Sequence, residues 1–200
     1  MKPSVVVFDL GGVLIDWQKH LAWIDDLGSR EAVDAFLARV DFSAKNLRGD
    51  GGALFSELAE ELDDAEDRAL LANYPSRFDR TIQGKIAGTW DILHRLKTAS
   101  VPLHAISNWS AETWPVAVKT HPELGQVFGV TVISGEERML KPQREIFDTL
   151  CQRANVAAHD CVFIDDSPKN VVGAKAAGMD AIQFTDPEAL ESALQDRGLL

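Results

Sequence analysis

Short, uninterrupted hydrophobic runs occur once near the start of the chain and repeatedly in its second half. The first run, Ser4 to Phe8, ends at Asp9 and is followed at once by Gly11 and Gly12. A continuous apolar run that ends at a glycine turn is typical of a central parallel strand buried on both faces. Together with four similar runs, it predicts the strands of a parallel sheet. The four lie at residues 103–106, 127–133, 161–164 and 181–184.

Amphipathic segments separate the later hydrophobic runs. They lie at residues 90–99, 111–119, 144–154 and 168–177, and each is expected to form a helix. Regular alternation of strand and helix is the pattern of α/β proteins with helices on both faces of a parallel sheet. The chain is therefore predicted to form a doubly wound, Rossmann-like α/β core.

The stretch from about Trp17 to Tyr74 interrupts this alternation. It contains no strand-like run, and its apolar residues follow helical spacing, as at Leu54, Leu58 and Leu62. A helical insertion directly after the first strand explains the interruption.

The insertion is expected to span residues 16–84, on a core made of residues 1–15 and 85–200. Turn-forming residues should mark the return of the chain to the core, where the sheet would resume near Thr89. These residues are Pro75, Gly84 and Gly88.

Composition narrows the class of protein. The 200 residues are 46% hydrophobic and 26% charged, as in globular domains, and the net charge is −11. This charge argues against nucleic acid or an anionic membrane as the main partner. The N-terminal apolar run is too short for a signal peptide or a membrane span. Cys151 and Cys161 have no metal-binding spacing, so free thiols and a cytoplasmic location are expected. The protein is also expected to be a monomer or a weak dimer.

Polar side chains stand where several of the predicted strands end. Ligands of an open parallel sheet bind at this edge, so these side chains are expected to lie together. Clustered carboxylates repel one another unless a hard cation offsets their charge, and oxygen ligands favour Mg²⁺. A cation and an ammonium group would bind a phosphoryl group there. The residues are Asp9, Ser107, Asn108, Asp165 and Asp166, with Lys141 at the start of a helix.

Four segments of the chain, in order, resemble the four motifs of the haloacid dehalogenase-like (HAD) superfamily, and the resemblance covers essentially the whole chain. They are Phe8-Asp9-Leu10-Gly11-Gly12-Val13-Leu14, Ile106-Ser107-Asn108, Lys141-Pro142 and Phe163-Ile164-Asp165-Asp166-Ser167-Pro168-Lys169-Asn170. The resemblance implies that Asp9 is a nucleophile and Ser107 a phosphate-binding hydroxyl. It also implies that the Gly11 carbonyl is a Mg²⁺ ligand and that the insertion is a small helical cap.

One position departs from the family pattern. Phosphatases of the superfamily usually have a second Asp two residues after the nucleophile, as acid and base, and this chain has Gly11 there. Haloacid dehalogenases also lack it, and a catalytically silent descendant would lack it too. A subgroup resembling the bacterial α-D-glucose-1-phosphate phosphatases has Asp-Leu-Gly here and is active, and this third interpretation is favoured. Asp16 is the nearest candidate for a substitute acid and base.

The expected function is Mg²⁺-dependent hydrolysis of a small phosphorylated metabolite, a sugar phosphate, through an aspartyl-phosphate on Asp9. The expected metal ligands are Asp9, the Gly11 carbonyl, Asp165 and Asp166, and the expected phosphate ligands are Ser107, Asn108 and Lys141. A haloacid dehalogenase and a silent domain that binds phosphate and Mg²⁺ remain the alternatives. Trp17 and Trp109 are as well suited to line the substrate pocket as to pack in the core. Arg48 is interpreted as a solvated arginine beside a glycine-rich cap loop.

Overall fold

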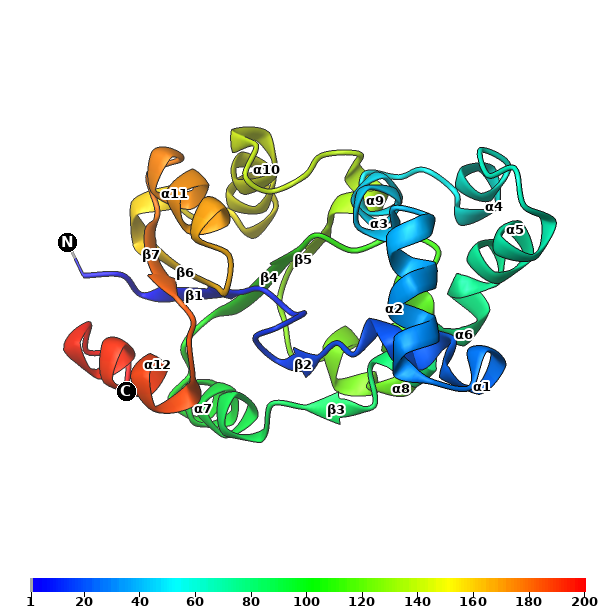
Figure 1. Ribbon diagram of the computed structural model, residues 1–200. Helices are drawn as coiled ribbons and strands as arrows, with labels where there is room; N and C mark the ends of the chain where they lie inside the picture. The colour runs from blue at the N-terminus through cyan, green and yellow to red at the C-terminus, as the bar shows by residue number, and fades with distance from the viewer. Residues whose placement is uncertain (1) are drawn as a thin grey trace.

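The computed structural model describes residues 2–200 and contains a parallel five-stranded sheet in the order β5-β4-β1-β6-β7. The first strand thus lies at the centre, and the chain moves outward first on one side and then on the other (Figure 1). This is the predicted doubly wound α/β fold. The strands are β1 (Val5–Phe8), β4 (Leu103–Ser107), β5 (Thr131–Ile133), β6 (Cys161–Asp165) and β7 (Asp180–Gln183).

Helices cover both faces of the sheet, which explains why the central strand β1 is hydrophobic without interruption. Val5 and Val7 of β1 belong to one buried cluster, whereas Val6 and Phe8 belong to the other. Figure 1 shows the first face under α10 and α11 and the second over α7 and α12. These helices are α7 (Ala87–Thr98), α10 (Arg144–Ala154), α11 (Pro168–Ala176) and α12 (Pro187–Asp196).

Local sequence sets where the helices begin. The side chain of Asp186 accepts a hydrogen bond from the backbone N–H of Ala189, and Pro187 occupies the first turn of α12. Pro168 has the same place in α11. Gly173 of α11 allows close packing, since a Cβ atom there would lie 2.6 Å from Cβ of Pro142. The loop that contains Pro142 is thereby held against the sheet core.

The helical insertion lies between two short antiparallel strands, β2 (Ile15–Asp16) and β3 (Gly84–Lys85). They connect the sheet with the group of helices at the right of Figure 1. We propose that residues 16–84 form the cap and that this two-stranded connection is its hinge. The helices of the insertion are η1 (Lys19–Ala22), α1 (Ile24–Leu27), α2 (Arg30–Arg39), α3 (Phe42–Asp50), α4 (Phe55–Ala59), α5 (Ala65–Ala72) and α6 (Tyr74–Thr81).

Aromatic side chains form the centre of the insertion. The Trp23 ring stacks on that of Tyr74, with centroids 5.1 Å apart, and meets Phe36 and Phe42 edge to face. The Trp23 Nε1–H donates to the carbonyl of Leu70 at 2.9 Å, which satisfies its only polar atom. The insertion therefore has a packed core of its own.

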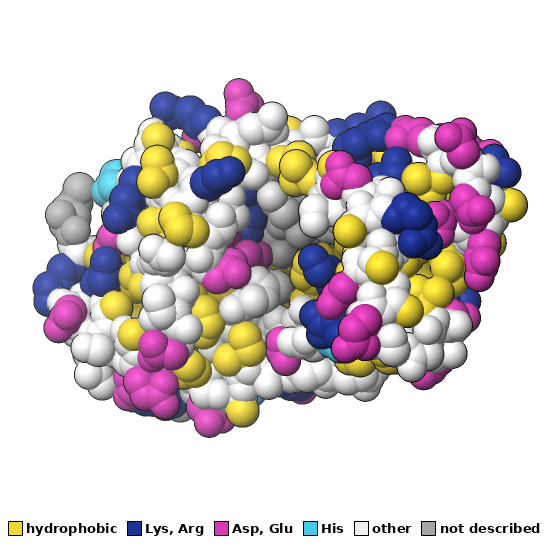
Figure 2. Space-filling model, in the orientation of Figure 1, with side chains coloured by type: hydrophobic (Ala, Val, Ile, Leu, Met, Phe, Trp, Pro, Cys, Tyr) yellow, Lys and Arg dark blue, Asp and Glu magenta, His cyan; other side chains and the backbone are white. Residues whose placement is uncertain are grey.

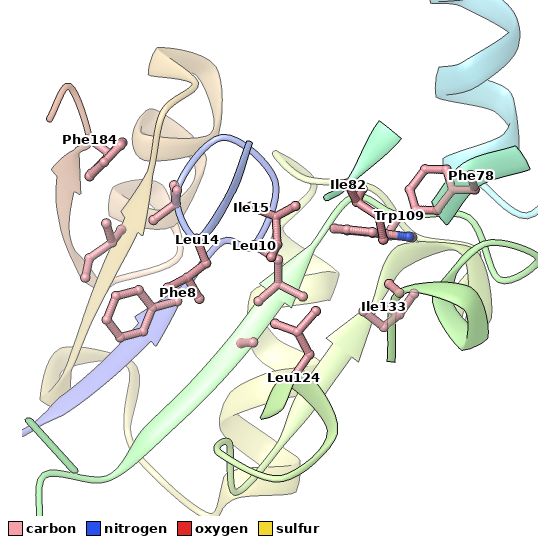
Figure 3. Packing of buried hydrophobic residues seen from close by; sticks show 14 of the residues in the cluster. Phe8, Leu10, Leu14, Ile15, Phe78, Ile82, Trp109, Leu124, Ile133 and Phe184 are labelled. Atoms are coloured by element: carbon pink, nitrogen blue, oxygen red, sulfur yellow. The ribbon is translucent and has the colours of Figure 1, made fainter. Parts of the chain in front are cut away.

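The two parts also share buried surface. Phe78 of α6 meets the ring of Trp109, which follows β4, edge to face at 5.4 Å. Figure 3 shows these two rings beside the hydrophobic residues that follow β1, including Leu10 and Ile15. This contact brings the insertion down onto the carboxyl ends of β1 and β4.

Several predicted boundaries were wrong. The strand expected over 127–133 is reduced to Thr131–Ile133, because the N–H of Val127 bonds to the carbonyl of Glu123 in a turn. Pro75 is not at the return of the chain but in the first turn of α6, where its missing N–H costs nothing. The sheet resumes at Leu103 rather than near Thr89, which lies in α7.

The remaining helices are short connections. They are α8 (Trp114–Thr120), η2 (Pro122–Gly125), α9 (Ser134–Glu137) and η3 (Ala158–Asp160), and α8 replaces the helix expected over 111–119. Among residues 2–200, no helix has the length and apolar character that crossing a membrane requires.

Replacement of Trp23 by Ala should destabilise the protein by about 3–5 kcal/mol, because it removes the ring at the centre of the aromatic cluster. Urea unfolding measures this change. Leu47→Ala is the control: Leu47 lies in the same insertion but is 51% exposed, so its change should stay within about 0.5 kcal/mol. Equal effects of the two variants would contradict the packed core described for the insertion.

Candidate active site

Asp9 follows the last residue of β1 and is the centre of a buried polar group. Its Oδ1 accepts hydrogen bonds from the N–H of Leu10 and from the hydroxyl of Ser107, both at 2.7 Å. The Lys141 ammonium lies 2.8 Å from the same oxygen. Burial, together with Asp165, raises the pKa of Asp9 to about 7, although Lys141 acts in the opposite direction.

The ammonium of Lys141 joins three strand ends. Besides Asp9, it contacts Oδ2 of Asp165 at 2.7 Å and the carbonyl of Ile106 at 3.1 Å. Desolvation alone would lower the pKa of Lys141, but the carboxylates of Asp9 and Asp165 raise it above its ordinary value overall. The side chain is therefore a permanent buried cation, matched to the two carboxylates that contact it.

Asn108 positions Lys141 from the neighbouring loop. Its side-chain Oδ1 accepts from the N–H of Lys141 at 2.8 Å, and its Nδ2 donates to the carbonyl of the same residue at 3.1 Å. Asn108 is an expected phosphate ligand, but the backbone of Lys141 already uses its side-chain amide. Asn108 still lines the cavity described below, so its backbone N–H is the group left to face a ligand there.

The two acidic residues at the end of β6 differ in their surroundings. Asp165 is fully buried, and its oxygens accept from the N–H of Ser167, the amide of Asn170 and the ammonium of Lys141. Asp166 is exposed and has no ion pair among the described residues. Burial, followed by the charge of Asp165, raises the pKa of Asp166. The carboxylate of Asp166 is therefore more available to a ligand than that of Asp165.

The donor set fits a hard divalent cation. Oxygen atoms of Asp9, Asp165 and Asp166 all lie within 4.8 Å of one another. Gly12 permits this arrangement: its φ is +76°, and a Cβ atom there would lie 2.7 Å from Oδ2 of Asp166. Gly11, with its carbonyl, lines the same cavity. Three carboxylates with one ammonium between them leave negative charge that a cation would offset.

A cavity of about 360 Å³ opens between the sheet edge and the insertion. Figure 2 shows this face of the molecule hollowed between the two parts, with acidic side chains at the edge of the hollow. The wall combines carboxylates, small polar groups and aromatic rings, which suits a ligand with both polar and apolar surface. The lining residues are Asp9, Gly11, Gly12, Asp16, Trp17, Asn46, Asp50, Phe78, Ser107, Asn108, Trp109, Thr113 and Asp166.

Both tryptophans whose place the sequence left open line this cavity. Trp109 is also buried against Phe78 and Trp114, so it serves the core and the cavity at once. Arg48 does not line it: its guanidinium forms a bidentate pair with Glu61 at 2.6 and 2.7 Å on the surface of the insertion. Interpreting Arg48 as a surface residue agrees with this position.

Asp16 and Asp50 reach the cavity from the start and from the middle of the insertion. Asp16, in β2, is exposed, and its carboxylate accepts from the amide of Gln18 at 2.6 Å. Asp50, the last residue of α3, was missed by the sequence analysis, which interpreted its glycine-rich surroundings only as a loop. Those glycines were the available signal, since they let the backbone beside Asp50 approach other segments: a Cβ atom on Gly52 would lie 3.1 Å from the carbonyl of Gly135.

Comparison with known proteins agrees with this architecture. The sequence matches the model of the family described as haloacid dehalogenase-like hydrolase over residues 3–178. A validoxylamine A 7′-phosphate phosphatase from Streptomyces hygroscopicus subsp. limoneus is 26% identical, over 95% of this chain and 91% of its own. A phosphoglycolate phosphatase from Xylella fastidiosa is 27% identical, over 88% of this chain and 78% of its own.

A solved structure has the same fold. An HAD family enzyme of Bacteroides thetaiotaomicron, in complex with magnesium and inorganic phosphate, superposes with a TM-score of 0.68. The identity is 21%, over 92% of this chain and 95% of that one. Neither phosphatase relative named above is a glucose-1-phosphate phosphatase, so that subgroup stays a prediction. The family match covers four of the five strands of the sheet and the whole insertion, and the chain therefore belongs to the haloacid dehalogenase-like hydrolases.

Proposed function

We propose that this hydrolase is a Mg²⁺-dependent phosphatase that acts on a small phosphomonoester, through an aspartyl-phosphate formed on Asp9. The observation that supports it best is the combination of three carboxylates within 4.8 Å and a buried lysine that contacts two of them. The substrates in the names of the two relatives are phosphate esters of small molecules.

Asp9 is suited to attack phosphorus. Its Oδ1 is held by Leu10, Ser107 and Lys141, whereas no hydrogen bond to Oδ2 is found from residues 2–200. One oxygen is thus fixed, and the other is available as the nucleophile at the cavity wall. Attack by Oδ2 forms the new phosphorus–oxygen bond while the ester oxygen leaves, and water then hydrolyses the aspartyl-phosphate.

Asp9, Asp166 and the Gly11 carbonyl are the groups that would hold Mg²⁺ directly. Asp165 would not contact the cation directly, since its oxygens already accept hydrogen bonds from Lys141, Ser167 and Asn170. When bound, the cation offsets the mutual repulsion between the carboxylates and the phosphate.

The residues at the end of β4 and in the loop before α10 would bind the phosphate oxygens. The hydroxyl of Ser107 and the ammonium of Lys141 both contact Oδ1 of Asp9, so they would be close to a phosphoryl group bonded to the other oxygen of the same carboxylate. The backbone N–H of Asn108 adds a third donor. Fixed donors aimed at developing charge are the main source of rate enhancement in phosphoryl transfer.

The leaving group would occupy the side of the cavity toward the insertion. Trp17, Asn46 and Phe78 line the cavity from the insertion. Trp109 and Thr113, from the segment after β4, complete this mixed aromatic and polar wall. Rings stack on the C–H faces of a sugar, and amides and hydroxyls bond to its hydroxyl groups. This mixture supports a sugar phosphate as the substrate.

The cellular setting is also a proposal. Both cysteines, Cys151 and Cys161, are free thiols, and Cys161 is buried. Free thiols in this position favour a reducing compartment. We therefore propose that the enzyme acts in the cytoplasm, as a monomer or weak dimer.

Hydrolysis of p-nitrophenyl phosphate should require added Mg²⁺ and should stop when EDTA removes it, because the clustered carboxylates otherwise repel the substrate. Asp9→Asn should abolish turnover, since it removes the nucleophile. Release of p-nitrophenolate measures both effects, and a panel of sugar phosphates tests the substrate class. Asp63→Asn, at an exposed position outside the cavity, is the matched control for loss of one acidic charge.

The alternatives give different results. A dehalogenase would release halide from a haloacid and would be indifferent to EDTA. A silent domain would bind Mg²⁺ and phosphate without turnover of any ester. Either result, in protein shown to be folded, would contradict the proposed phosphatase.

Replacement of Lys141 by Gln should lower stability and activity together. It leaves Asp9 and Asp165 buried without their cation, and loss of one partner of a buried pair costs about 3–5 kcal/mol. Urea unfolding and phosphatase assays measure the two effects. Lys175→Gln, at an exposed position of α11, should change neither measurement appreciably. A stable Lys141→Gln variant of normal activity would contradict the role given to this lysine.

A further inference from the structure

The geometry at Gly11 leaves a catalytic role unfilled. An alkoxide leaving group needs a proton, and the water that attacks an aspartyl-phosphate must lose one. Gly11 has no side chain to provide either step, although a Cβ atom there would meet only the Trp109 ring, at 4.0 Å. Another residue of the cavity is therefore the candidate for this proton transfer, and this inference rests on the proposed phosphatase function.

Four carboxylates line the cavity: Asp9, Asp16, Asp50 and Asp166. Asp9 is the proposed nucleophile and Asp166 a proposed metal ligand, so neither is free to exchange a proton with the leaving group. Asp16 is exposed, and its carboxylate is held by Gln18. Asp50 is the remaining carboxylate, and it comes from α3 of the insertion, the part of the chain that we propose to face the leaving group.

Hydrogen bonds fix the backbone of Asp50 to the core. The hydroxyl of Ser134 donates to the carbonyl of Asp50 at 2.6 Å. The same hydroxyl oxygen accepts from the N–H of Trp109 at 2.9 Å. Trp109 follows Ser107 and Asn108 directly in the chain, so a single buried hydroxyl connects Asp50 to the loop that would bind phosphate. The position of Asp50 is thus set by the active site as well as by the insertion.

A hydrogen bond also fixes the side chain of Asp50. Its Oδ2 accepts from the amide of Asn46 at 2.9 Å, which fixes the plane of the carboxyl group. Asn46 also lines the cavity, one turn earlier on the same helix. No ion pair to Asp50 exists among residues 2–200, so the carboxyl is free of the compensating cation that the other buried carboxylates of the site contact.

The electrostatic surroundings favour a carboxyl that can gain and lose a proton near neutral pH. Burial, and after it the charge of Asp9, raises the pKa of Asp50 to about 7, while Lys141 and the backbone N–H of Ser110 act in the opposite direction. Glu137 of α9, the helix packed against α3, is paired with Arg153. A pKa near the working pH is the one that suits a general acid and base.

We propose that Asp50 is the general acid and base of this enzyme. In the first step Oδ2 of Asp9 bonds to phosphorus, the bond from phosphorus to the ester oxygen breaks, and that oxygen takes the proton of Asp50. In the second step water bonds to phosphorus, the bond from phosphorus to Asp9 breaks, and the proton of the water returns to Asp50. The carboxyl group ends the cycle as it began, with no further reactant.

Asp50→Asn tests the assignment through the leaving group. With a simple alkyl phosphate, whose alkoxide needs the proton, turnover should fall about 10²–10⁴-fold. With p-nitrophenyl phosphate, whose leaving group needs no proton, the first step should persist and only the second should slow. The variant should therefore release about one p-nitrophenolate per active site in a burst, and acid quenching should trap the aspartyl-phosphate.

Three further variants and a folding control make the result decisive. Asp63→Asn should retain wild-type turnover of both esters, and circular dichroism should show that Asp50→Asn is folded, since Asn has the same shape and can still accept from Asn46. Asp50→Glu, which keeps a carboxyl group, should recover part of the alkyl phosphatase activity. A burst in Asp16→Asn and none in Asp50→Asn would assign the proton to Asp16 and overturn the proposal.

Other results separate this inference from the proposed function. If Asp50→Asn hydrolyses both esters at the wild-type rate, or loses both equally without a trapped aspartyl-phosphate, Asp50 is not the acid and base and the phosphatase function stands. If the wild-type enzyme hydrolyses no phosphate ester with Mg²⁺, the proposed function fails and this proposal fails with it.

Discussion

The buried ammonium of Lys141 is the interaction on which the rest of the site depends. It lies between Asp9 and Asp165, at 2.8 and 2.7 Å, and these two carboxylates come from adjacent strands, β1 and β6. Two acidic groups at neighbouring strand ends would repel each other in a buried site. The lysine offsets one of the two negative charges and leaves the other. The two strands can therefore lie side by side while the edge of the sheet keeps a net negative charge. That residual charge would attract a cation to the edge.

The site divides its chemistry between two parts of the chain. The sheet edge provides the groups that would act on phosphorus, whereas the insertion contributes the aromatic and amide side chains on the far side of the cavity. The hydroxyl of Ser134 bonds to both parts, through Trp109 and Asp50. A rearrangement of the insertion would therefore also shift the loop at the end of β4. In the proposed function, this hydroxyl would connect the catalytic geometry with the selection of the leaving group.

The sequence was sufficient for the sheet and the polar groups at its edge, because both depend on local order. A buried parallel strand is hydrophobic throughout, so Val5–Phe8 and Cys161–Ile164 could be placed from their composition alone. Parallel strands then bring their carboxyl ends to one edge, which is why Asp9, Ser107 and Asp165 could be predicted to meet.

What the sequence could not provide depends on contacts between distant segments. Asp50 reaches the cavity because α3 packs against α9, and no periodicity in either segment indicates that pairing. The side-chain amide of Asn108 looked free to bind phosphate, and only the folded loop shows that the backbone of Lys141 uses it. The strand at 127–133 was overestimated because valine and phenylalanine also suit a partly buried turn. Tertiary contacts decide such cases, and local preferences do not.

The two-residue strands β2 and β3 have a consequence for how such an enzyme can change over evolution. Ile15 pairs with Lys85, and Asp16 with Gly84, so the chain leaves and re-enters the core at adjacent points. Because the ends are already together, the length of what lies between them has little effect on the core: each doubling of a closed loop costs only about 0.6 kcal/mol of entropy. The insertion can be exchanged or enlarged as a module while β1 keeps its register. New substrates can thus be acquired without rebuilding the chemistry of the sheet edge.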